Sequence, residues 1–293
     1  GGTGKTSLVS SFAHLAENAV LCDCDVDAAD LHIILQPDIQ KTHAFSGGKQ
    51  AKIRYDKCQS CGTCKKLCKF NAVKKTNETY TIDPVFCEGC GVCYWFCPAE
   101  AIEFQEVQNG EWYESNAKNG SLIHAKLFAA QENSGKLVSV IREAARKTDG
   151  EKEKNLIIID GSPGIGCPVI ASITGADYVL IVTEPTLSGK HDMERVIALC
   201  RHFQIPCSVT INKWDINPEI SNSIEDFCRK NNISIPGKIR YDLNITYSQI
   251  ELKSIVEFTS QGAAEDIKNI WEIILNQLTM SDKNEFSNSL NCG

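Results

Sequence analysis

The chain has 293 residues, of which 42% are hydrophobic and 23% are charged, a composition that supports a globular core and about two domains. The formal net charge of −7 argues against a general nucleic-acid binder, because affinity for phosphates depends on clustered Lys and Arg. No apolar run is long enough to span a bilayer. Fifteen cysteines do not indicate a disulfide framework, which is typical of short secreted chains, so we expect a reducing, cytoplasmic environment.

The first motif is GGTGKTS at residues 1–7, which leads into a helix predicted over residues 5–18. Small residues allow backbone N–H groups to close on phosphate oxygens, and the positive end of the helix adds to the attraction. Lys5 is expected to reach the β- and γ-phosphates, and Thr6 to hold Mg²⁺. The predicted phosphate loop consists of Gly1, Gly2, Thr3, Gly4, Lys5, Thr6 and Ser7.

A short apolar strand is predicted over residues 19–23, and it ends in acidic residues. Asp23 is its last residue and Asp25 follows closely. A turn and a short helix are expected over residues 27–35. Because ligands bind at the carboxyl ends of parallel strands, we expect both carboxylates near the phosphate loop.

Residues 56–108 differ from the rest of the chain, and we interpret them as a small α+β domain inserted after the second strand. The pattern C-x₂-C-x₂-C-x₃-C occurs twice in this segment, which is the spacing of bacterial ferredoxins with two clusters. In that arrangement the fourth cysteine of each run binds the other cluster. One [4Fe–4S] cluster is predicted on Cys58, Cys61, Cys64 and Cys97, and a second on Cys87, Cys90, Cys93 and Cys68.

The inserted segment has an uneven charge distribution. From Lys49 to Lys75 there are nine Lys or Arg and one Asp, whereas from Thr76 to Ser115 there are acidic residues and no Lys or Arg. An ordinary solvated surface explains this pattern equally well. The alternative is that the basic residues attract an acidic redox partner.

From about Gly120 strands again alternate with helices, which predicts a mostly parallel sheet covered on both faces. Buried strands are expected over residues 155–160, 178–183 and 207–213, and helices over residues 132–147, 188–203 and 218–231. Asp160 ends the first of these strands, and a carboxylate in that position is expected near Mg²⁺. A last amphipathic helix is predicted over residues 262–278, and the polar tail 279–293 is expected to be disordered.

Three segments, GGTGKTS, LCDCDVDAADLHIIL and LIIIDGSPGIG, resemble the deviant Walker A ATPases of the MinD/ParA/Mrp class, which includes the nitrogenase iron protein. The chain is most similar to MinD-superfamily ATPases with an inserted ferredoxin domain. The resemblance implies an α/β P-loop fold over residues 1–55 and 109–278, Mg²⁺ near Asp23, and Asp25 orienting the attacking water. It also implies a nucleotide-dependent homodimer.

The resemblance further favours ATP, with Asn212 near the adenine, although INKWD at residues 211–215 also contains the N-K-x-D pattern that reads guanine. The family's loop is preceded by a strand and a lysine, so we expect residues of the full protein to be missing before Gly1. Cys167, in DGSPGIGC, is expected either to pack as an apolar group or to lie at a dimer interface.

Two functions fit these features: ATP hydrolysis coupled to electron transfer through two [4Fe–4S] clusters, and ATP-dependent assembly or carriage of an iron–sulfur or metal cofactor. We favour the first, because eight fixed cysteines suit a permanent site. A ParA- or MinD-like positioning protein is less favoured, since the last helix carries Glu265, Asp266 and Glu272 and lacks the basic face that anionic lipid requires. We therefore expect a redox or metallocluster protein as the partner, and neither nucleic acid nor membrane. A plain ferredoxin on an inert scaffold is the remaining alternative.

Overall fold

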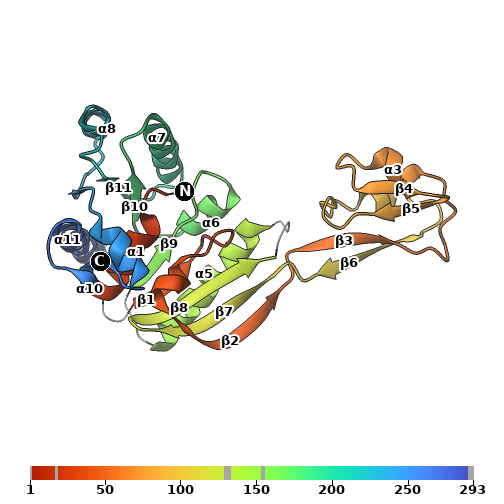
Figure 1. Cartoon of the computed structure of the whole chain (residues 1–293), viewed down its shortest axis with the longest axis horizontal. Helices are drawn as coiled ribbons and strands as arrows, with labels where there is room; N and C mark the ends of the chain where they lie inside the picture. The colour runs from red at the N-terminus through yellow and green to blue at the C-terminus, as the bar shows by residue number, and fades with distance from the viewer. Residues whose placement is uncertain (1, 17–18, 129–132, 153–155, 290–293) are drawn as a thin grey trace.

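The computed structural model describes residues 2–16, 19–128, 133–152 and 156–289, and its side chains are described outside 151–152 and 280–289. An α/β body forms most of the molecule. A small module stands away from this body at the end of a two-stranded arm (Figure 1). The arrangement matches the predicted α/β fold with a small insertion.

The larger sheet of the body has five strands in the order β2-β7-β8-β1-β9. They are β1 (Ala19–Asp23), β2 (Asp38–Phe45), β7 (Gly110–Ala117), β8 (Gly120–Leu127) and β9 (Ile157–Asp160). β1 runs parallel to β8 and β9, whereas β7 is antiparallel to β2 and β8. Because β1 is buried on both faces, its residues are apolar without alternation until Asp23.

A second sheet is parallel and has three strands, β10 (Val179–Thr183), β11 (Cys207–Asn212) and β12 (Lys238–Ile239). β9 ends the first sheet and β10 ends the second. In the part of the chain that the structure describes, no strand pairing joins these two edges. Side chains from both strands line one cavity, so the two edges face each other.

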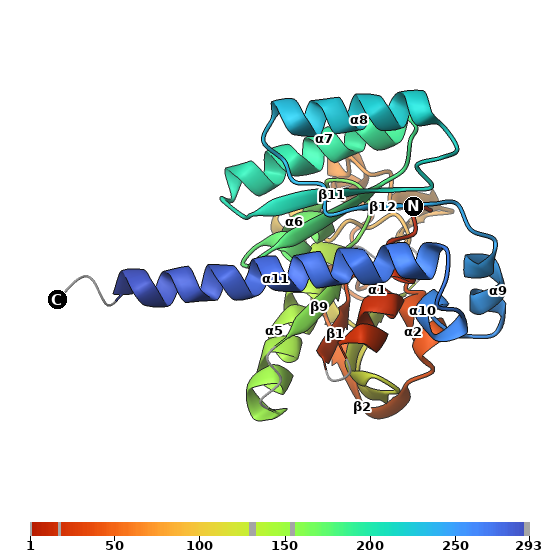
Figure 2. The same cartoon turned by 90° about the vertical axis from the view of Figure 1, so that its left-hand side faces the viewer.

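Helices cover the body on both sides (Figure 1, Figure 2). One side carries α1 (Lys5–Leu15), α10 (Ile255–Phe258) and α11 (Ala263–Ser289), the opposite side carries α5 (Ser134–Lys152) and α6 (Cys167–Ile173), and α7 (Leu187–His202) and α8 (Pro218–Lys230) cover the smaller sheet. The shorter helices are α2 (Leu31–Leu35) and α9 (Asn244–Ile250). Phe12 of α1 packs on Trp271 of α11 with ring centroids 4.8 Å apart, which fixes α1 under the sheet.

The last helix extends beyond its predicted end. Its buried face contains Ile267, Ile270, Trp271 and Ile274, as the spacing predicts. A disordered tail was expected from residue 279, whereas α11 is drawn to Ser289 and contains no Gly or Pro that would end it earlier. Residues 290–293 lie outside the described residues. Within the described chain, no helix is both long and apolar enough to cross a membrane.

The inserted unit is larger than predicted, because it includes an arm. The arm consists of β3 (Gly48–Ile53) paired antiparallel with β6 (Ile102–Val107). The module at its end contains the hairpin β4 (Val73–Thr76) and β5 (Thr79–Ile82) and two short helices, α3 (Thr63–Leu67) and α4 (Val92–Trp95), one in each cysteine run. The expected start at residue 56 therefore misses the first strand of the arm.

A buried histidine on β8 makes the stability of the body sensitive to pH. His124 is 6% exposed, and its Nε2 lies 2.9 Å from Ser115 Oγ. Burial, together with the nearby charge of His32, lowers the pKa of His124 from 6.5 to about 4. Between these two pH values the unfolded chain binds a proton that the folded chain does not, so stability falls as the pH falls.

Lowering the pH from 7 to 5 should therefore reduce the free energy of unfolding by about 2 kcal/mol through His124 alone. The substitution His124→Gln removes the titrating group. Between pH 7 and 5, the free energy of unfolding of this variant should therefore fall by about 2 kcal/mol less than that of the unmodified protein. Denaturant unfolding of both proteins at several pH values, followed by tryptophan fluorescence, measures the difference. Identical pH profiles would contradict the assignment.

Candidate functional site

The phosphate loop has the backbone that an anion site needs. Gly2 and Gly4 both have φ of +86°, a conformation that side chains disfavour. A Cβ on Gly4 would also lie 2.4 Å from Asn212 Nδ2. Helix α1 begins directly after Gly4, and no side chain caps its first turn. The free N–H groups of the first turn and the positive end of the helix dipole therefore both point at the loop.

Two carboxylates meet at the strand ends beside this loop. β1 and β9 pair in register, with Asp23 opposite Asp160. Both residues are almost fully buried, at 0% and 1% exposure. The backbone on either side is held in place: Cys24 N donates to Asp160 O at 2.8 Å, and Asp25 N donates to Asp23 Oδ1 at 3.1 Å.

Burial controls the acidity of this pair. It raises the pKa of Asp160 to about 6, against the lowering effects of the Thr6 hydroxyl and the Lys5 charge. Burial also raises the pKa of Asp23 well above its usual value, and the negative charge of Asp160 adds to the shift. Two adjacent buried carboxylates without a cation are unfavourable. A divalent cation held between them would remove much of this cost.

Asp25 lies closer to solvent than Asp23. Burial raises its pKa, and the charge of Lys5 lowers it. Lys5 therefore faces both Asp25 and Asp160. The structure thus brings together the predicted phosphate lysine and the three predicted acidic residues.

Unpartnered buried atoms gather at the same edge. In the described residues, Thr3 Oγ1, Asp23 Oδ2 and Asp160 Oδ1 are buried and have no hydrogen-bond partner. Such atoms are costly in a native protein unless a ligand or water satisfies them. One hydroxyl donor and two carboxylate acceptors fit a phosphate with its Mg²⁺, so the residues present suit the predicted nucleotide and metal.

Asn212 holds the phosphate loop in place. Its Nδ2 donates to Thr3 O at 2.9 Å, and its Oδ1 accepts from Lys213 N at 3.0 Å. Asp215, the acidic residue of the N-K-x-D pattern, accepts from Tyr241 N at 2.8 Å. Both side chains therefore have structural roles in the loops around the site. Of the remaining predicted loop residues, Ser7 Oγ accepts from Gln249 Nε2 at 2.8 Å, and Gly1 lies outside the described residues.

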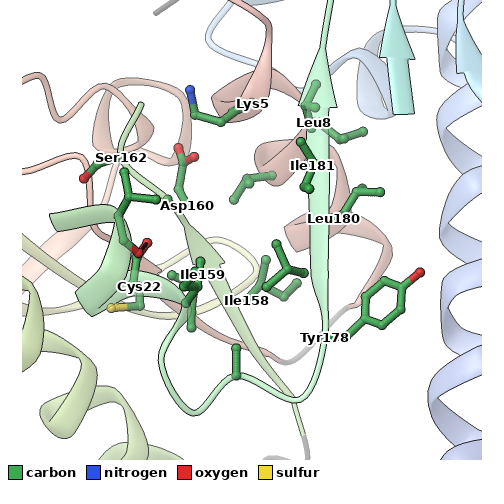
Figure 3. Close-up of a pocket in the computed structure, with 18 of the residues that line it drawn as sticks. Lys5, Leu8, Cys22, Ile158, Ile159, Asp160, Ser162, Tyr178, Leu180 and Ile181 are labelled. Atoms are coloured by element: carbon green, nitrogen blue, oxygen red, sulfur yellow. Dashed lines mark hydrogen bonds between the residues drawn. The ribbon is translucent and has the colours of Figure 1, made fainter. Parts of the chain in front are cut away.

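An apolar cavity of about 480 Å³ extends from this site between β9 and β10. Figure 3 shows Lys5 and Asp160 at one end, close to Ser162. Ile158, Leu180 and other apolar side chains line much of the rest, together with Tyr178. The end of the cavity at Lys5 and Asp160 belongs to the phosphate site.

In the module, cysteines from both runs line one small cavity. Cys58, Cys61 and Cys64 of the first run share it with Cys97 of the second run. Burial raises the pKa of Cys64, and the thiolates of Cys58 and Cys61 raise it further. Four thiols around one cavity fit the ligand set of a [4Fe–4S] cluster, with the crossing of runs that the spacing predicts.

The second group of cysteines is only partly defined. Burial raises the pKa of Cys93 to about 11, and the charges of Cys87 and Cys90 add to it, so these three thiols are close together. Cys68, the predicted fourth ligand, is half-buried. Among the residues that the structure describes, no three His, Cys, Asp or Glu side chains close around a single metal ion.

Sequence reasoning missed the residues that connect the parts of the site. The Ser162 hydroxyl donates to Cys24 O, which ties the loop after Asp160 to the loop after Asp23. Asn109 Oδ1 accepts from Gly47 N at 2.9 Å and from Gly48 N at 3.1 Å, which fixes the base of the arm. The only sequence feature that could have indicated this clamp is the pair of glycines next to the insertion.

Comparison with known proteins identifies the inserted module. The family model described as a 4Fe-4S binding domain matches residues 80–103. "Ferredoxin 7Fe" of Hydrogenibacillus schlegelii is 32% identical over 57 residues, which cover 20% of this chain and 73% of that protein. The insertion is therefore a ferredoxin-like domain of the 4Fe–4S type.

The whole chain has the fold of the MinD/ParA P-loop ATPases. The septum site-determining protein MinD of Pyrococcus horikoshii, solved with Mg-ADP, superposes with a TM-score of 0.55 over 94% of this chain and 91% of that one, at 12% identity. "Uncharacterized protein MJ0578" of Methanocaldococcus jannaschii is 31% identical over 278 residues, which cover 93% of this chain and 92% of that protein. The chain belongs to the family of this archaeal protein.

Proposed function

We propose that the protein is an ATPase in which ATP binding and hydrolysis control electron transfer through two [4Fe–4S] clusters, in a nucleotide-dependent homodimer. The fold of the body and the ferredoxin-like insertion support the two halves of this proposal. The observation that carries the link between them is the position of the arm base. It lies at the carboxyl edge of the sheet, where Leu127, the partner of Gly110, donates to the loop that follows Asp23.

At the nucleotide site each side chain would have one task. Lys5 would bind the β- and γ-phosphates, Thr6 and the two buried carboxylates would hold Mg²⁺, and Asp25 would orient the attacking water. When bound, Mg²⁺ neutralises charge that develops on the phosphate oxygens. Asn212 keeps the loop in the conformation that presents its N–H groups. We favour ATP, because Asp215 is already engaged by Tyr241 N and so has less capacity to read guanine.

In the module, Cys58, Cys61, Cys64 and Cys97 would hold one cluster, and Cys87, Cys90, Cys93 and Cys68 the other. The clusters supply one-electron storage when present. The protein exposes Cys61 and Cys90, one cysteine in each run, so each site would have an edge near solvent. These edges are where electrons would enter and leave.

The first contact between the halves involves the loop after Asp25. Leu127 N, at the end of β8, donates to Val26 O. Val26 shares a buried cluster with Phe45, the last residue before the arm. Phe45 in turn pairs with Gly110 across β2 and β7. A displacement of the Asp25 loop therefore presses directly on the residues that begin and end the arm.

The second contact passes through the start of α5. A Cβ added to Gly135 would lie 2.9 Å from Cys167 Cβ, so α5 packs directly on the residue that follows the Asp160 loop. The next residues of α5 reach the arm: Lys136 Nζ donates to Ser46 O at 3.5 Å. Asn133 lies within 3.1 Å of the Cβ positions of Gly47 and Gly48. The start of α5 thus bridges the nucleotide loop and the arm.

The alternative function is delivery of a cluster or metal cofactor to another protein, which the exposure of Cys61 and Cys90 also favours. The two functions differ in what leaves the protein. An electron carrier keeps its iron through repeated oxidation and reduction, whereas a delivery protein loses iron to an apo-acceptor in the presence of MgATP. Iron analysis of the re-isolated protein distinguishes them.

We expect MgATP, compared with MgADP, to shift the reduction potential of at least one cluster. A shift of about 59 mV corresponds to about 1.4 kcal/mol for a one-electron couple, which is within the usual range of allosteric coupling. In Asn109→Ala the shift should shrink, because the arm base loses the oxygen that accepts from Gly47 N and Gly48 N. Potentiometric titration followed by EPR measures both.

The matched control is Asn109→Asp, which keeps an oxygen at the same position and should retain the shift. ATP hydrolysis should be similar in all three proteins, since the Asn109 oxygen accepts from the backbone of Gly47 and Gly48 at the arm base. Equal potentials with MgATP and MgADP in the unmodified protein would show that the two halves are not coupled.

A further inference from the structure

The exposed lysines around the first cysteine run form a basic face on the module. Lys57 precedes Cys58, Lys65 and Lys66 lie on α3, and Lys69 follows Cys68. All four are exposed. None of the four takes part in an ion pair with any residue that the structure describes, and the adjacent Asp56 is paired with Arg54 at 2.7 Å.

Lys65 and Lys66 directly follow Cys64, one of the cysteines that line the first cavity. Cys61, which lines the same cavity, is exposed, and its Sγ lies 3.4 Å from Thr63 Oγ1. The basic face therefore adjoins, along the chain, a cavity that has an exposed cysteine.

The second cysteine run has other neighbours. Trp95 is 76% exposed and Phe96 is 66% exposed, next to Cys97. The segment from Thr76 to Ser115, which contains this run, has acidic residues and no Lys or Arg. The lysines of the basic face therefore belong to the chain segment that carries the first run.

We propose that the basic face, formed by Lys57, Lys65, Lys66 and Lys69, is the docking surface for an acidic electron-transfer protein. Opposite charges draw such a partner to the face and orient it over Cys61. The face is a local exception in a chain whose formal net charge is −7, so attraction is confined to this region. Nucleic acid is the less favoured occupant, because the net negative charge of the chain opposes binding of a long polyanion.

The proposal rests on the proposed electron transfer, and in each encounter one electron passes from a reduced cluster to the partner's acceptor group. The test uses the reconstituted protein, reduced with dithionite, and two probes of opposite charge: an acidic flavodoxin and a basic cytochrome c. The variant is Lys65→Glu/Lys66→Glu. The control is Lys147→Glu/Lys230→Glu, which makes the same charge change on exposed residues of the body.

At low ionic strength the Lys65→Glu/Lys66→Glu variant should reduce flavodoxin at least about 10-fold more slowly than the unmodified protein, and cytochrome c no more slowly. The control variant should be close to the unmodified protein with both probes. At about 0.5 M salt the differences should disappear. A second measurement is independent of rates: carbodiimide should cross-link flavodoxin carboxylates to Lys65 and Lys66, as mapped by mass spectrometry.

Equal slowing in both variants, or cross-links confined to lysines elsewhere, would overturn the docking surface. Binding of a single-stranded RNA probe that is lost in Lys65→Glu/Lys66→Glu, together with unchanged flavodoxin rates, would assign the face to nucleic acid and also overturn it. Failure of electron transfer itself has a different signature, since an iron-loaded, reduced protein would then reduce neither probe.

Discussion

Replacing Lys5 by alanine should lower the affinity for MgATP by about 100-fold or more, a loss of about 3 kcal/mol. Lys5 faces Asp25 and Asp160 across the phosphate loop, and its charge opposes the rise in pKa of both carboxylates. Without Lys5, both the bound phosphates and the buried carboxylates would lose the positive charge of its ammonium group. Titration with a fluorescent nucleotide analogue or calorimetry measures the change in affinity.

Two further variants show whether the loss is specific. Lys147→Ala removes an exposed lysine of α5 that pairs only with Glu143 in the described ion pairs, so its affinity should be unchanged. Asp25→Ala should bind MgATP but hydrolyse it far more slowly, because in the proposed function Asp25 orients water and does not hold the phosphates. If Lys5→Ala bound the nucleotide with the affinity of the unmodified protein, the loop would not be part of the nucleotide site.

The second large effect is expected in the module. Cys97→Ser should lower the iron content from about eight atoms per chain to about four, because Cys97 lines the same cavity as the first run although it belongs to the second. The surviving EPR signal should come from the cluster on the second run. Cys68→Ser should remove that other cluster and leave the first. Iron and sulfide analysis after anaerobic reconstitution measures both losses.

Cys167→Ser is the matched control, since Cys167 is exposed and lies outside the module. Its iron content should equal that of the unmodified protein. If Cys97→Ser lost the cluster of its own run instead, each run would bind its cluster without crossing. Zinc in place of iron in the unmodified protein would reject both cluster sites.

The core of the body was predictable because its strands have a strong local pattern. Residues 156–159 and 178–182 are continuous apolar runs, and such runs form buried parallel strands when helices alternate with them. The last acidic residues of β1 and β9 then had to meet at one edge, and Asp23 does lie opposite Asp160. This part of the site follows from strand polarity alone.

The antiparallel part of the sheet was not predicted, because pairing between distant residues stabilises it. Glu114 on β7 bridges two side chains of β2, Lys41 at 3.0 Å and His43 at 2.9 Å. Trp112 stacks on His43 with ring centroids 3.8 Å apart. These partners are about seventy positions apart in the sequence, across the whole insertion. No local pattern in either strand reveals them.

The role of Asn212 was also beyond sequence reasoning. The N-K-x-D pattern directs attention to the base of a nucleotide, whereas in the structure Asn212 donates to Thr3 O, 209 positions away. Its position depends on how the end of β11 meets the start of α1. That contact is set by packing of the whole body, and a four-residue pattern does not contain it.

The junction between the arm and the body has a consequence for the gene as well as for the protein. The chain leaves the sheet after Phe45 and returns at Gly110, and these two residues are direct partners in an antiparallel ladder. A tight turn of a few residues would close the same ladder without the module. Gain, loss or replacement of the arm and its module therefore leaves the register of every strand in the body unchanged. One recombination event at this turn would give a relative with a different inserted domain, or with none, on the same α/β body.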